Sequence, residues 1–416
     1  MSSSSTHIES FIVPTVVVMF CFWTASSSSV VESLPGFGSL PFRLETGYVG
    51  VDYDNDVQLF YYFVESEGNP GKDPLLLWLT GGPGCSGISG LLYEIGPLRF
   101  VKAVYNGTIP SLVPNPYSWT KVSSIIFVDA PVGTGFSYAK NPEGYETGDM
   151  TYARHCHDFL KKWLLDHPRF IGHSVYVAGD SYSGMIVPLI AQYILQESDD
   201  LMHEAPINLK GYLLGNPATD PDSDESSKLT FAYHGALIPK DLYECTDLVN
   251  HAHILEPKCI GFSPQRSGLL EDGRKHQEEI PELRCRSYVN VLCHVYVNDP
   301  IVQESLHVRK ICRLCGFGPG LDVTEAYPTP MMLPALGDQD MVIPYLGTQS
   351  WIESMDLPVI EEWRPWKVDD EVAGYVRSYE NHLTFATVKG GGHTAPEYLP
   401  KSCFLMFRRW ISGESI

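Results

Sequence analysis

A serine lies between two glycines at the point where a buried apolar run gives way to an apolar helical pattern. The run Val175–Ala178 is followed by Gly179-Asp-Ser-Tyr-Ser-Gly184 and then by the helical pattern Met185–Leu195. The spacing is Gly-x-Ser-x-x-Gly, one residue longer than the G-x-S-x-G of a nucleophile elbow. In this setting it predicts such an elbow, a strained strand-to-helix turn that exposes the serine hydroxyl above a sheet. An ordinary tight turn is the alternative. The pattern makes Ser181 a candidate nucleophile for covalent catalysis.

A serine hydroxyl is a weak nucleophile, so it requires a base, and the base requires an acid that orients it. Two glycine-bearing turns later in the chain supply these groups. The turn Gly337-Asp-Gln-Asp340 offers an acid, and the turn Lys389-Gly-Gly-Gly-His393 offers a base directly after an apolar run. The order serine, acid, histidine is the one expected after a nucleophile elbow. The residues alone leave Asp338 and Asp340 as alternatives for the acid.

The oxyanion that forms during attack on a carbonyl needs two backbone N–H donors. The residue after the nucleophile, Tyr182, supplies one, and a glycine-rich loop after an earlier strand supplies the other. The segment Thr80-Gly-Gly-Pro-Gly-Cys-Ser86, which follows the apolar run Leu75–Leu79, matches this requirement. A phosphate-binding loop is the alternative. Such a loop ends in Gly-Lys-Ser/Thr, and this segment has no lysine.

Short apolar and β-branched runs alternate with helical patterns and predict the strands that position these groups. The predicted strands are Leu75–Leu79, Ile125–Val128, Val175–Ala178, Tyr212–Leu214 and Phe385–Val388. Buried runs that alternate with helices indicate a mostly parallel central sheet flanked by helices, an α/β fold. Residues 216–320 are richer in charge, histidine and paired cysteines, and we interpret them as a helical insertion that caps the sheet.

Composition excludes several classes of protein. The 416 residues carry 29 Lys and Arg against 50 Asp and Glu, a net charge of −21, and 44% of them are hydrophobic. The chain has 12% aromatic and 19% charged residues, and after the first thirty residues it has no apolar run long enough to span a bilayer. We therefore expect neither a disordered nor a polytopic membrane protein. Because a phosphate backbone is bound by clustered Lys and Arg, nucleic acid is not an expected partner.

The N-terminus has the pattern of a cleaved signal peptide, here residues 1–29. The apolar stretch Phe11–Trp23 is followed by small polar residues. Because no Lys or Arg precedes this stretch, a short membrane anchor is the alternative. We expect a secreted or vacuolar protein with no stable membrane association after cleavage. In such a protein Asn106, in the sequon Asn106-Gly-Thr108, is a candidate glycosylation site.

Nine cysteines remain after the signal peptide, and the oxidising secretory pathway favours disulfides among them. Seven are disulfide candidates: Cys85, Cys245, Cys259, Cys285, Cys293, Cys312 and Cys315. Cysteines 245 and 259, and 285 and 293, are natural local pairs, whereas Cys85 would close a long loop to cysteine 312 or 315. A zinc site is the alternative for the C-x-x-C at 312–315, but a single C-x-x-C lacks the second half of such a site. We therefore expect no metal and no cofactor.

Taken together, these segments resemble the serine carboxypeptidase family, and within it the plant serine carboxypeptidase-like proteins. The matching segments are Trp78-Leu-Thr-Gly-Gly-Pro-Gly-Cys-Ser86, Tyr93-Glu-Ile-Gly-Pro97, Asp129-Ala-Pro-Val-Gly-Thr-Gly-Phe-Ser-Tyr138, Gly179-Asp-Ser-Tyr-Ser-Gly184, Gly337-Asp-Gln-Asp-Met341 and Gly391-Gly-His-Thr-Ala-Pro-Glu-Tyr398. The resemblance implies a single α/β-hydrolase domain over residues 30–416, with Ser181, Asp340 and His393 as the catalytic triad. It also implies that the N–H groups of Gly82 and Tyr182 form the oxyanion hole.

The resemblance further implies a subsite for the substrate's terminal carboxylate. The family's carboxypeptidases form it from an asparagine, a glycine and two glutamic acids, and here the four positions are Thr80, Gly81, Glu94 and Asp180. Clustered carboxyls cannot all ionise, so one stays protonated and donates to the substrate carboxylate in mild acid. Threonine and aspartate at two of the positions look like the branch of the family that transfers acyl groups from glucose esters to small acceptors.

One segment departs from the family pattern. The stretch between His307 and Gly337 is shorter than usual, and it ends in Pro328-Thr-Pro-Met-Met-Leu-Pro-Ala-Leu336. Each proline removes a backbone donor, so three prolines disfavour a central strand here. We therefore expect that Asp340 is misplaced or mobile in this chain.

Three functional hypotheses follow. The first is a carboxypeptidase that releases C-terminal residues, and the second is an acyltransferase that uses a 1-O-acylglucose ester. The third is a catalytically impaired relative that acts by binding. A lipase-type esterase is a weaker fourth, because it leaves the matches at Trp78–Ser86 and His393–Tyr398 unexplained. The expected ligand is a small-molecule ester or a peptide.

Overall fold

The computed structural model describes residues 28–198, 207–237, 288–308 and 331–416. Most of the predicted signal peptide and much of the predicted cap lie outside these ranges. So do five disulfide candidates, namely Cys245, Cys259, Cys285, Cys312 and Cys315. In the part that is described, Cys85 and Cys293 form no disulfide, and no helix is long and apolar enough to span a bilayer.

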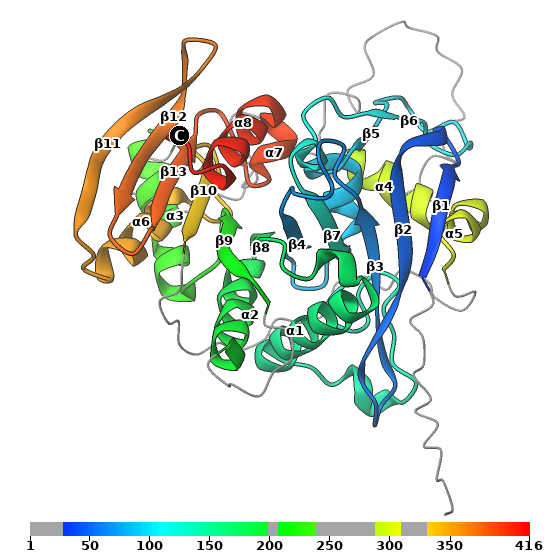
Figure 1. Ribbon diagram of the computed structural model, residues 1–416. Coiled ribbons are helices and arrows are strands. Elements are labelled where there is room, and N and C mark those ends of the chain that lie inside the picture. The colour runs from blue at the N-terminus through cyan, green and yellow to red at the C-terminus, as the bar shows by residue number, and fades with distance from the viewer. Residues whose placement is uncertain (1–27, 199–206, 238–287, 309–330) are drawn as a thin grey trace, which may run out of the picture.

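One large sheet runs through the described part of the molecule (Figure 1). In chain order its strands are β1 (Ser28–Leu34), β2 (Gly38–Asp52), β3 (Val57–Val64), β4 (Leu75–Leu79), β7 (Ser124–Val128), β8 (Val175–Asp180), β9 (Leu209–Gly215), β10 (Met332–Gly337), β11 (Val359–Val368), β12 (Glu371–Tyr379) and β13 (Thr384–Val388). Their spatial order is β1-β2-β3-β7-β4-β8-β9-β10-β13-β12-β11. The strands from β7 to β13 in this order pair in parallel, and the strands at both edges pair antiparallel. The parallel pairing predicted from the sequence is confirmed for the central strands, but the sheet as a whole is mixed, because five of its ten described strand pairs are antiparallel.

The remaining elements are short connections and helices. They are β5 (Leu98–Phe100), β6 (Leu112–Pro114), the short helices Gly90–Glu94, Trp119–Lys121, Pro142–Tyr145 and Pro168–Phe170, α1 (Asp149–Asp166), α2 (Ser183–Ser198), α3 (Pro221–His234), α4 (Tyr288–Asn298), α5 (Pro300–Ser305), α6 (Tyr345–Ser354), α7 (Ala395–Tyr398) and α8 (Pro400–Ile411). α1 and α2 lie on one side of the sheet and α7 and α8 on the other (Figure 1).

Two hydrophobic cores form because side chains alternate along each central strand. In β4, Leu76 and Trp78 face the core that α8 covers, whereas Leu75, Leu77 and Leu79 face the core that α1 and α2 cover. All five residues are buried, which explains why the sequence shows a continuous apolar run instead of an alternating one. Burial of each large side chain contributes about 1.5–3 kcal/mol. The five predicted strands are all present.

The expectation that prolines disfavour a central strand before Asp340 is wrong. β10 lies between β9 and β13, and Pro334 is inside it, in register with Leu214 of β9. On the other side of β10, Met332 forms an isolated bridge with Leu383, just before β13. Regular pairing with β13 begins only at Ala335. The ladder is interrupted where Pro334 has no N–H to donate, so the strand accommodates the proline without losing its central position.

The structure bears only in part on the predicted signal peptide, the predicted insertion and the predicted glycosylation site. β1 begins at Ser28, so the first strand starts just inside the predicted signal peptide 1–29. Of the predicted insertion 216–320, α4 and α5 pack beside β5 and β1 rather than as a separate unit. The candidate glycosylation site Asn106 is exposed.

Candidate active site

Ser181 occupies a sharp turn between β8 and α2. Its φ angle is +53°, in the left-handed region that residues with a side chain rarely adopt. The turn is fixed by the Ser181 N–H, which donates to the Gly215 carbonyl at 2.8 Å, and by the Ala218 N–H, which donates to the Ser181 carbonyl at 2.9 Å. A Cβ atom at Gly184 would lie 2.4 Å from the Ala218 carbonyl oxygen, so only glycine fits there. The strand, turn and helix that the segment Gly179–Gly184 predicts are all present.

Three side chains from distant parts of the chain form a continuous series of contacts. His393 Nε2 is 2.9 Å from Ser181 Oγ, and His393 Nδ1 is 2.7 Å from Asp340 Oδ2. The three residues follow β8, β10 and β13, whose carboxyl ends meet at one edge of the sheet because the strands are parallel. The expectation that Asp340 is misplaced is therefore wrong, since β10 delivers it to His393.

The two aspartates of the turn after β10 have different partners. Asp340 contacts His393, whereas Asp338 Oδ1 accepts hydrogen bonds from the Gly390 N–H at 2.6 Å and from Gln339 Nε2 at 3.0 Å. Asp338 thus ties the acid-bearing turn to the histidine-bearing loop. The two aspartates that the residues alone left as alternatives are distinguished by this geometry.

Asn216 is a site residue that sequence reasoning missed. It directly follows β9, is fully buried, and donates from Nδ2 to Asp340 Oδ2 at 2.7 Å. Its Oδ1 accepts the Gly337 N–H at 3.0 Å, and the Val342 N–H donates to Asp340 Oδ1 at 2.7 Å. These bonds fix the orientation of the carboxylate. The signal available in the sequence was an asparagine at the carboxyl end of a predicted central strand.

The charge of Asp340 controls the protonation of His393. Burial alone would lower the pKa of His393, but the negative charge of Asp340 and its hydrogen bond outweigh burial and raise that pKa above the usual 6.5. Asp180 contributes in the same direction. A histidine with a raised pKa holds a proton more tightly, which suits a base that takes the serine proton and later returns it.

The glycine-rich loop after β4 packs directly on the elbow. A Cβ atom at Gly81 would lie 2.6 Å from Ser181 Cβ and 2.8 Å from the Tyr182 backbone nitrogen, so no side chain fits there. The Cys85 N–H donates to the Gly81 carbonyl at 3.1 Å and closes the loop into a turn. The predicted oxyanion donors, the N–H groups of Gly82 and Tyr182, therefore belong to two segments that meet beside Ser181.

The predicted carboxylate-binding residues also lie at this edge. The Gly81 N–H donates to Asp180 Oδ1 at 3.0 Å, and the Thr80 hydroxyl oxygen is 3.2 Å from both Trp78 Nε1 and Ser89 Oγ. Glu94 is 4% exposed, and its Oε2 has no hydrogen-bond partner. Burial and then the charge of Asp180 raise the pKa of Glu94 well above 4.5. Burial also raises the pKa of Asp180, against the opposing effects of His393 and the Gly81 N–H.

The chain is similar to known proteins over most of its length. The family model described as serine carboxypeptidase matches residues 35–248 and 330–413. Serine carboxypeptidase-like 7 from Arabidopsis thaliana is 43% identical over 444 residues, which cover 96% of this chain and 97% of that protein. Serine carboxypeptidase-like 5 from the same plant is 45% identical over 413 residues and covers 94% of each chain.

A solved structure has a similar fold. It is that of Kex1(delta)p, a prohormone-processing carboxypeptidase from Saccharomyces cerevisiae, with a TM-score of 0.72 and 22% sequence identity. The similarity covers 93% of this chain and 95% of that chain. At this identity the likeness concerns the fold alone, which is the α/β-hydrolase fold that the motif order predicts.

Proposed function

Since this chain belongs to the serine carboxypeptidase family, we propose that it forms an acyl-enzyme on Ser181 and releases C-terminal residues from peptides. The observation that supports this proposal most strongly is the series of contacts from Ser181 through His393 to Asp340, at 2.9 and 2.7 Å. A nucleophile, its base and the group that orients the base are thereby within hydrogen-bond reach of each other.

The proposed reaction has two halves. His393 Nε2 takes the proton from Ser181 Oγ as the oxygen attacks the carbonyl carbon, and the N–H groups of Gly82 and Tyr182 stabilise the oxyanion. His393 then donates the proton to the leaving amine, and the acyl-enzyme forms. In the second half His393 takes a proton from water as the water oxygen attacks the ester carbon. The bond to Ser181 Oγ then breaks, and His393 returns the proton to Oγ. Asp340 orients the ring and stabilises its charged form throughout.

A protonated Glu94 supports recognition of a terminal carboxylate. Because its pKa is raised, Glu94 keeps its proton in mild acid, and its buried Oε2 has no partner in the free protein. A neutral carboxyl group can donate to a substrate carboxylate that an ionised one would repel. We therefore expect peptide cleavage to be favoured in mild acid.

An acyltransferase is the second candidate, and Thr80 and Asp180 favour it. Both are shorter than the asparagine and glutamic acid of the family's carboxypeptidases. The Thr80 hydroxyl also contacts Trp78 and Ser89, so it has less capacity for a substrate carboxylate. Transfer requires an acceptor alcohol that is positioned well enough to compete with water for the acyl-enzyme. The first half-reaction is common to both candidates.

Parallel assays on the purified chain separate the two candidates. One assay offers a blocked dipeptide at acid pH, and the other offers a 1-O-acylglucose ester with a small alcohol acceptor. Release of the C-terminal amino acid without any transfer product supports the peptidase, and formation of the new ester supports the acyltransferase. The Ser181→Ala variant should be inactive in both assays. Activity that survives in this variant would contradict the acyl-enzyme proposal.

The secreted or vacuolar location is also a proposal, supported by the apolar stretch Phe11–Trp23 and by the exposure of Asn106. Expression of the full chain in plant cells tests both features. The protein should enter the secretory pathway and become lighter on treatment with an endoglycosidase, and Asn106→Gln should remove that change in mass. Retention of the untreated mass in the parent chain would contradict glycosylation at this position.

A further inference from the structure

Asp129 is a fully buried carboxylate at the carboxyl end of β7 that joins two loops. Its Oδ1 accepts the Ser86 hydroxyl at 2.5 Å and the Gly87 N–H at 2.9 Å. Its Oδ2 accepts the Phe136 N–H at 2.8 Å and lies 3.5 Å from the Tyr62 hydroxyl. Both oxygens are thus committed to hydrogen bonds inside the protein, and none of these partners belongs to the Ser181–His393–Asp340 series.

The first of the two loops is the one that carries the predicted oxyanion donor. Ser86 ends the segment Thr80–Ser86, and the hydrogen bond between the Cys85 N–H and the Gly81 carbonyl, at 3.1 Å, links its two halves. Gly82 therefore lies in a turn with two supports. Gly81 packs on the elbow at one end, and Ser86 and Gly87 are bonded to Asp129 at the other.

We propose that Asp129 is a positioning residue that holds the Gly82 N–H where it stabilises the oxyanion. It acts through Ser86 and Gly87 and touches neither the substrate nor Ser181. This inference rests on the proposed function, because an oxyanion arises only if Ser181 attacks a carbonyl. It goes beyond that proposal by assigning a role in catalysis to a carboxylate outside the triad and outside the carboxylate-binding subsite.

The donors around Asp129 explain why an isosteric substitution is informative. Asparagine has the same shape, but its amide nitrogen would face an N–H or O–H donor whichever way the group is turned. Asp129→Asn should therefore weaken the attachment of one loop without creating a cavity. Ser86→Ala removes a single hydrogen bond from the same attachment and should produce a smaller version of the same effect.

The test uses matched ester and thionoester substrates. Backbone N–H groups stabilise a developing negative charge on oxygen better than one on sulfur, so a well-placed donor makes the ester react faster than the thionoester. We expect Asp129→Asn to lower kcat for the ester at least tenfold, with KM changed less than threefold. Asp129→Asn should also lower the ratio of kcat/KM for the ester to kcat/KM for the thionoester. Ser86→Ala should lower this ratio by a smaller factor.

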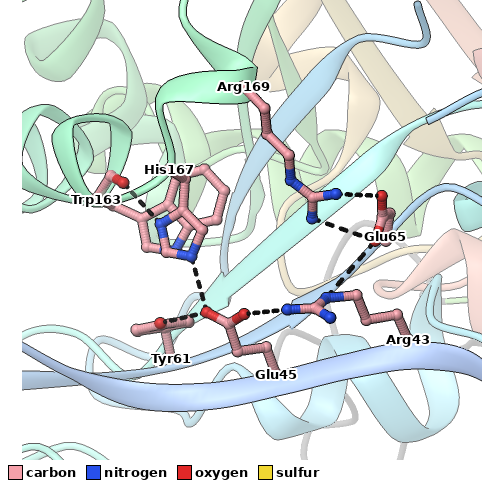
Figure 2. Close-up of polar contacts among 7 residues, drawn as sticks. All are labelled: Arg43, Glu45, Tyr61, Glu65, Trp163, His167 and Arg169. Carbon is pink, nitrogen blue, oxygen red and sulfur yellow. Dashed lines mark hydrogen bonds and ion pairs between the residues drawn. The ribbon is translucent and has the colours of Figure 1, made fainter. Parts of the chain in front are cut away.

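Glu45 supplies the control. It is a buried carboxylate with several hydrogen bonds, in a separate cluster with Arg43, Tyr61 and His167 (Figure 2). Glu45→Gln should destabilise the protein and leave the ester to thionoester ratio of the folded enzyme at the parent value. If Asp129→Asn and Ser86→Ala also leave that ratio unchanged, their effects are merely structural and the inference is overturned.

The outcomes separate this inference from the proposed function. A parent chain that a fluorophosphonate probe does not label at Ser181 would contradict the proposed function itself. A parent that is labelled, with an unchanged ratio in both Asp129→Asn and Ser86→Ala, would contradict only the positioning role. If Asp129→Asn fails to fold, Ser86→Ala alone decides, because it keeps the carboxylate and removes one donor.

Discussion

Two buried carboxylates in this protein have opposite surroundings. Glu45, on β2, is 3% exposed and contacts His167 Nε2 at 2.8 Å, the Tyr61 hydroxyl at 2.9 Å and an Arg43 guanidinium nitrogen at 3.0 Å (Figure 2). Asp129, on the loop after β7, is 0% exposed and has neutral donors as its hydrogen-bond partners. The first cluster contains the positively charged guanidinium of Arg43 beside an imidazole and a phenol. The second contains hydroxyl and backbone N–H groups.

The difference decides which carboxylate keeps its proton. Burial alone would raise the pKa of Glu45, but His167, Tyr61 and Arg43 outweigh burial and lower it to about 2. For Asp129 burial is the largest effect, the neutral donors offset only part of it, and the pKa rises to about 6. Neutral hydrogen-bond donors thus offset only part of the rise in carboxyl pKa that burial causes. Partners that include a positively charged group can outweigh burial and lower the pKa.

The Glu45 cluster and the surroundings of Asp129 also connect different parts of the structure. Glu45 joins β2 to His167, directly after α1, and Arg43 links the cluster to Glu65, which forms two hydrogen bonds with Arg169 at 2.8 and 3.2 Å. Asp129 lies with Asp180 and Glu94 near the carboxyl ends of the central strands, where neither Asp129 nor Glu94 has a cationic hydrogen-bond partner. We expect changes in the first region to affect stability and changes in the second to affect catalysis.

Among these substitutions, Asp340→Asn should have the largest effect on catalysis. The substitution keeps the shape of the side chain but removes the charge that orients and stabilises the His393 ring, so kcat for an ester substrate should fall on the order of 10⁴-fold. The melting temperature should also fall, because the amide nitrogen would face a donor whichever way the group is turned, the Val342 N–H on one side and Asn216 Nδ2 on the other. Steady-state kinetics and thermal unfolding on the same sample measure both quantities. A fall of less than tenfold would contradict the role assigned to Asp340.

Glu45→Gln should show the opposite behaviour. Loss of the buried charge leaves the Arg43 guanidinium without its anion and His167 Nε2 without its carboxylate partner, and the free energy of unfolding at pH 7 should fall by about 3 kcal/mol. The kcat/KM of the folded protein should stay within about twofold of the parent value. Chemical denaturation measures the first quantity. Asp369→Asn, which removes an exposed ion pair with Lys401, is the control and should leave the free energy of unfolding nearly unchanged.

The pH dependence of stability should separate the two carboxylates. The pKa of Asp129 is raised from 3.8 to about 6, so its charge destabilises the folded state above about pH 6 and this effect disappears as pH falls toward 3.8. The pKa of Glu45 is lowered from 4.5 to about 2, so its charge stabilises the folded state above pH 4.5 and this contribution is lost as pH falls toward 2. Each contribution amounts to about 3 kcal/mol.

Denaturation curves across this range test the assignment. Asp129→Asn should flatten the profile between pH 3.8 and 6, and Glu45→Gln should flatten it between pH 2 and 4.5. The titratable groups near Asp129 are Tyr62 and Cys293, and the raised pKa values of both keep them neutral throughout. If both variants flattened the same interval, the contrast between the two environments would be wrong.

The smallest effect should appear in the pH profile of peptide cleavage. Because its pKa is raised, Glu94 should lose its proton only at higher pH, and kcat/KM for a blocked dipeptide should then fall. The side chain in Glu94→Gln is neutral at every pH, so the variant should keep cleaving the dipeptide at high pH. At one pH unit above the pKa of Glu94, its kcat/KM should be about tenfold higher than that of the parent. Glu45→Gln should leave the profile where it is. An unchanged alkaline limb in Glu94→Gln would contradict the donor role of Glu94.

Sequence reasoning predicted the centre of the fold better than its edges. β4, β7, β8, β9 and β13 are continuous apolar runs because they are buried on both faces. The edge strand β11 is exposed along most of its length, so hydrophobicity gives no comparable signal there. The three prolines before Asp340 argue against a strand at β10, because each removes a backbone donor. The interrupted pairing with β13 that accommodates Pro334 cannot be read from composition.

The residues of the site also fall into two groups, those that the sequence predicts and those that it does not. Ser181 and His393 lie in turns whose glycines and flanking runs mark them, so they were predicted from local patterns. Asn216 and the contact between Ser86 and Asp129 leave no such trace, because each depends on residues far apart in the chain, by 124 and 43 positions. Only the parallel order of the strands brings these residues together.

The central claim is that Ser181 is made nucleophilic by His393 and Asp340, despite the prolines in the segment that precedes the acid. The most direct measurement is intact-mass analysis after reaction with a fluorophosphonate probe, followed by peptide mapping, on the parent chain, Ser181→Ala and Asp340→Asn. We predict one adduct on the parent, located at Ser181, no adduct on Ser181→Ala and a much slower reaction of Asp340→Asn. A folded parent without an adduct at Ser181, or an Asp340→Asn variant that reacts as fast as the parent, would contradict it.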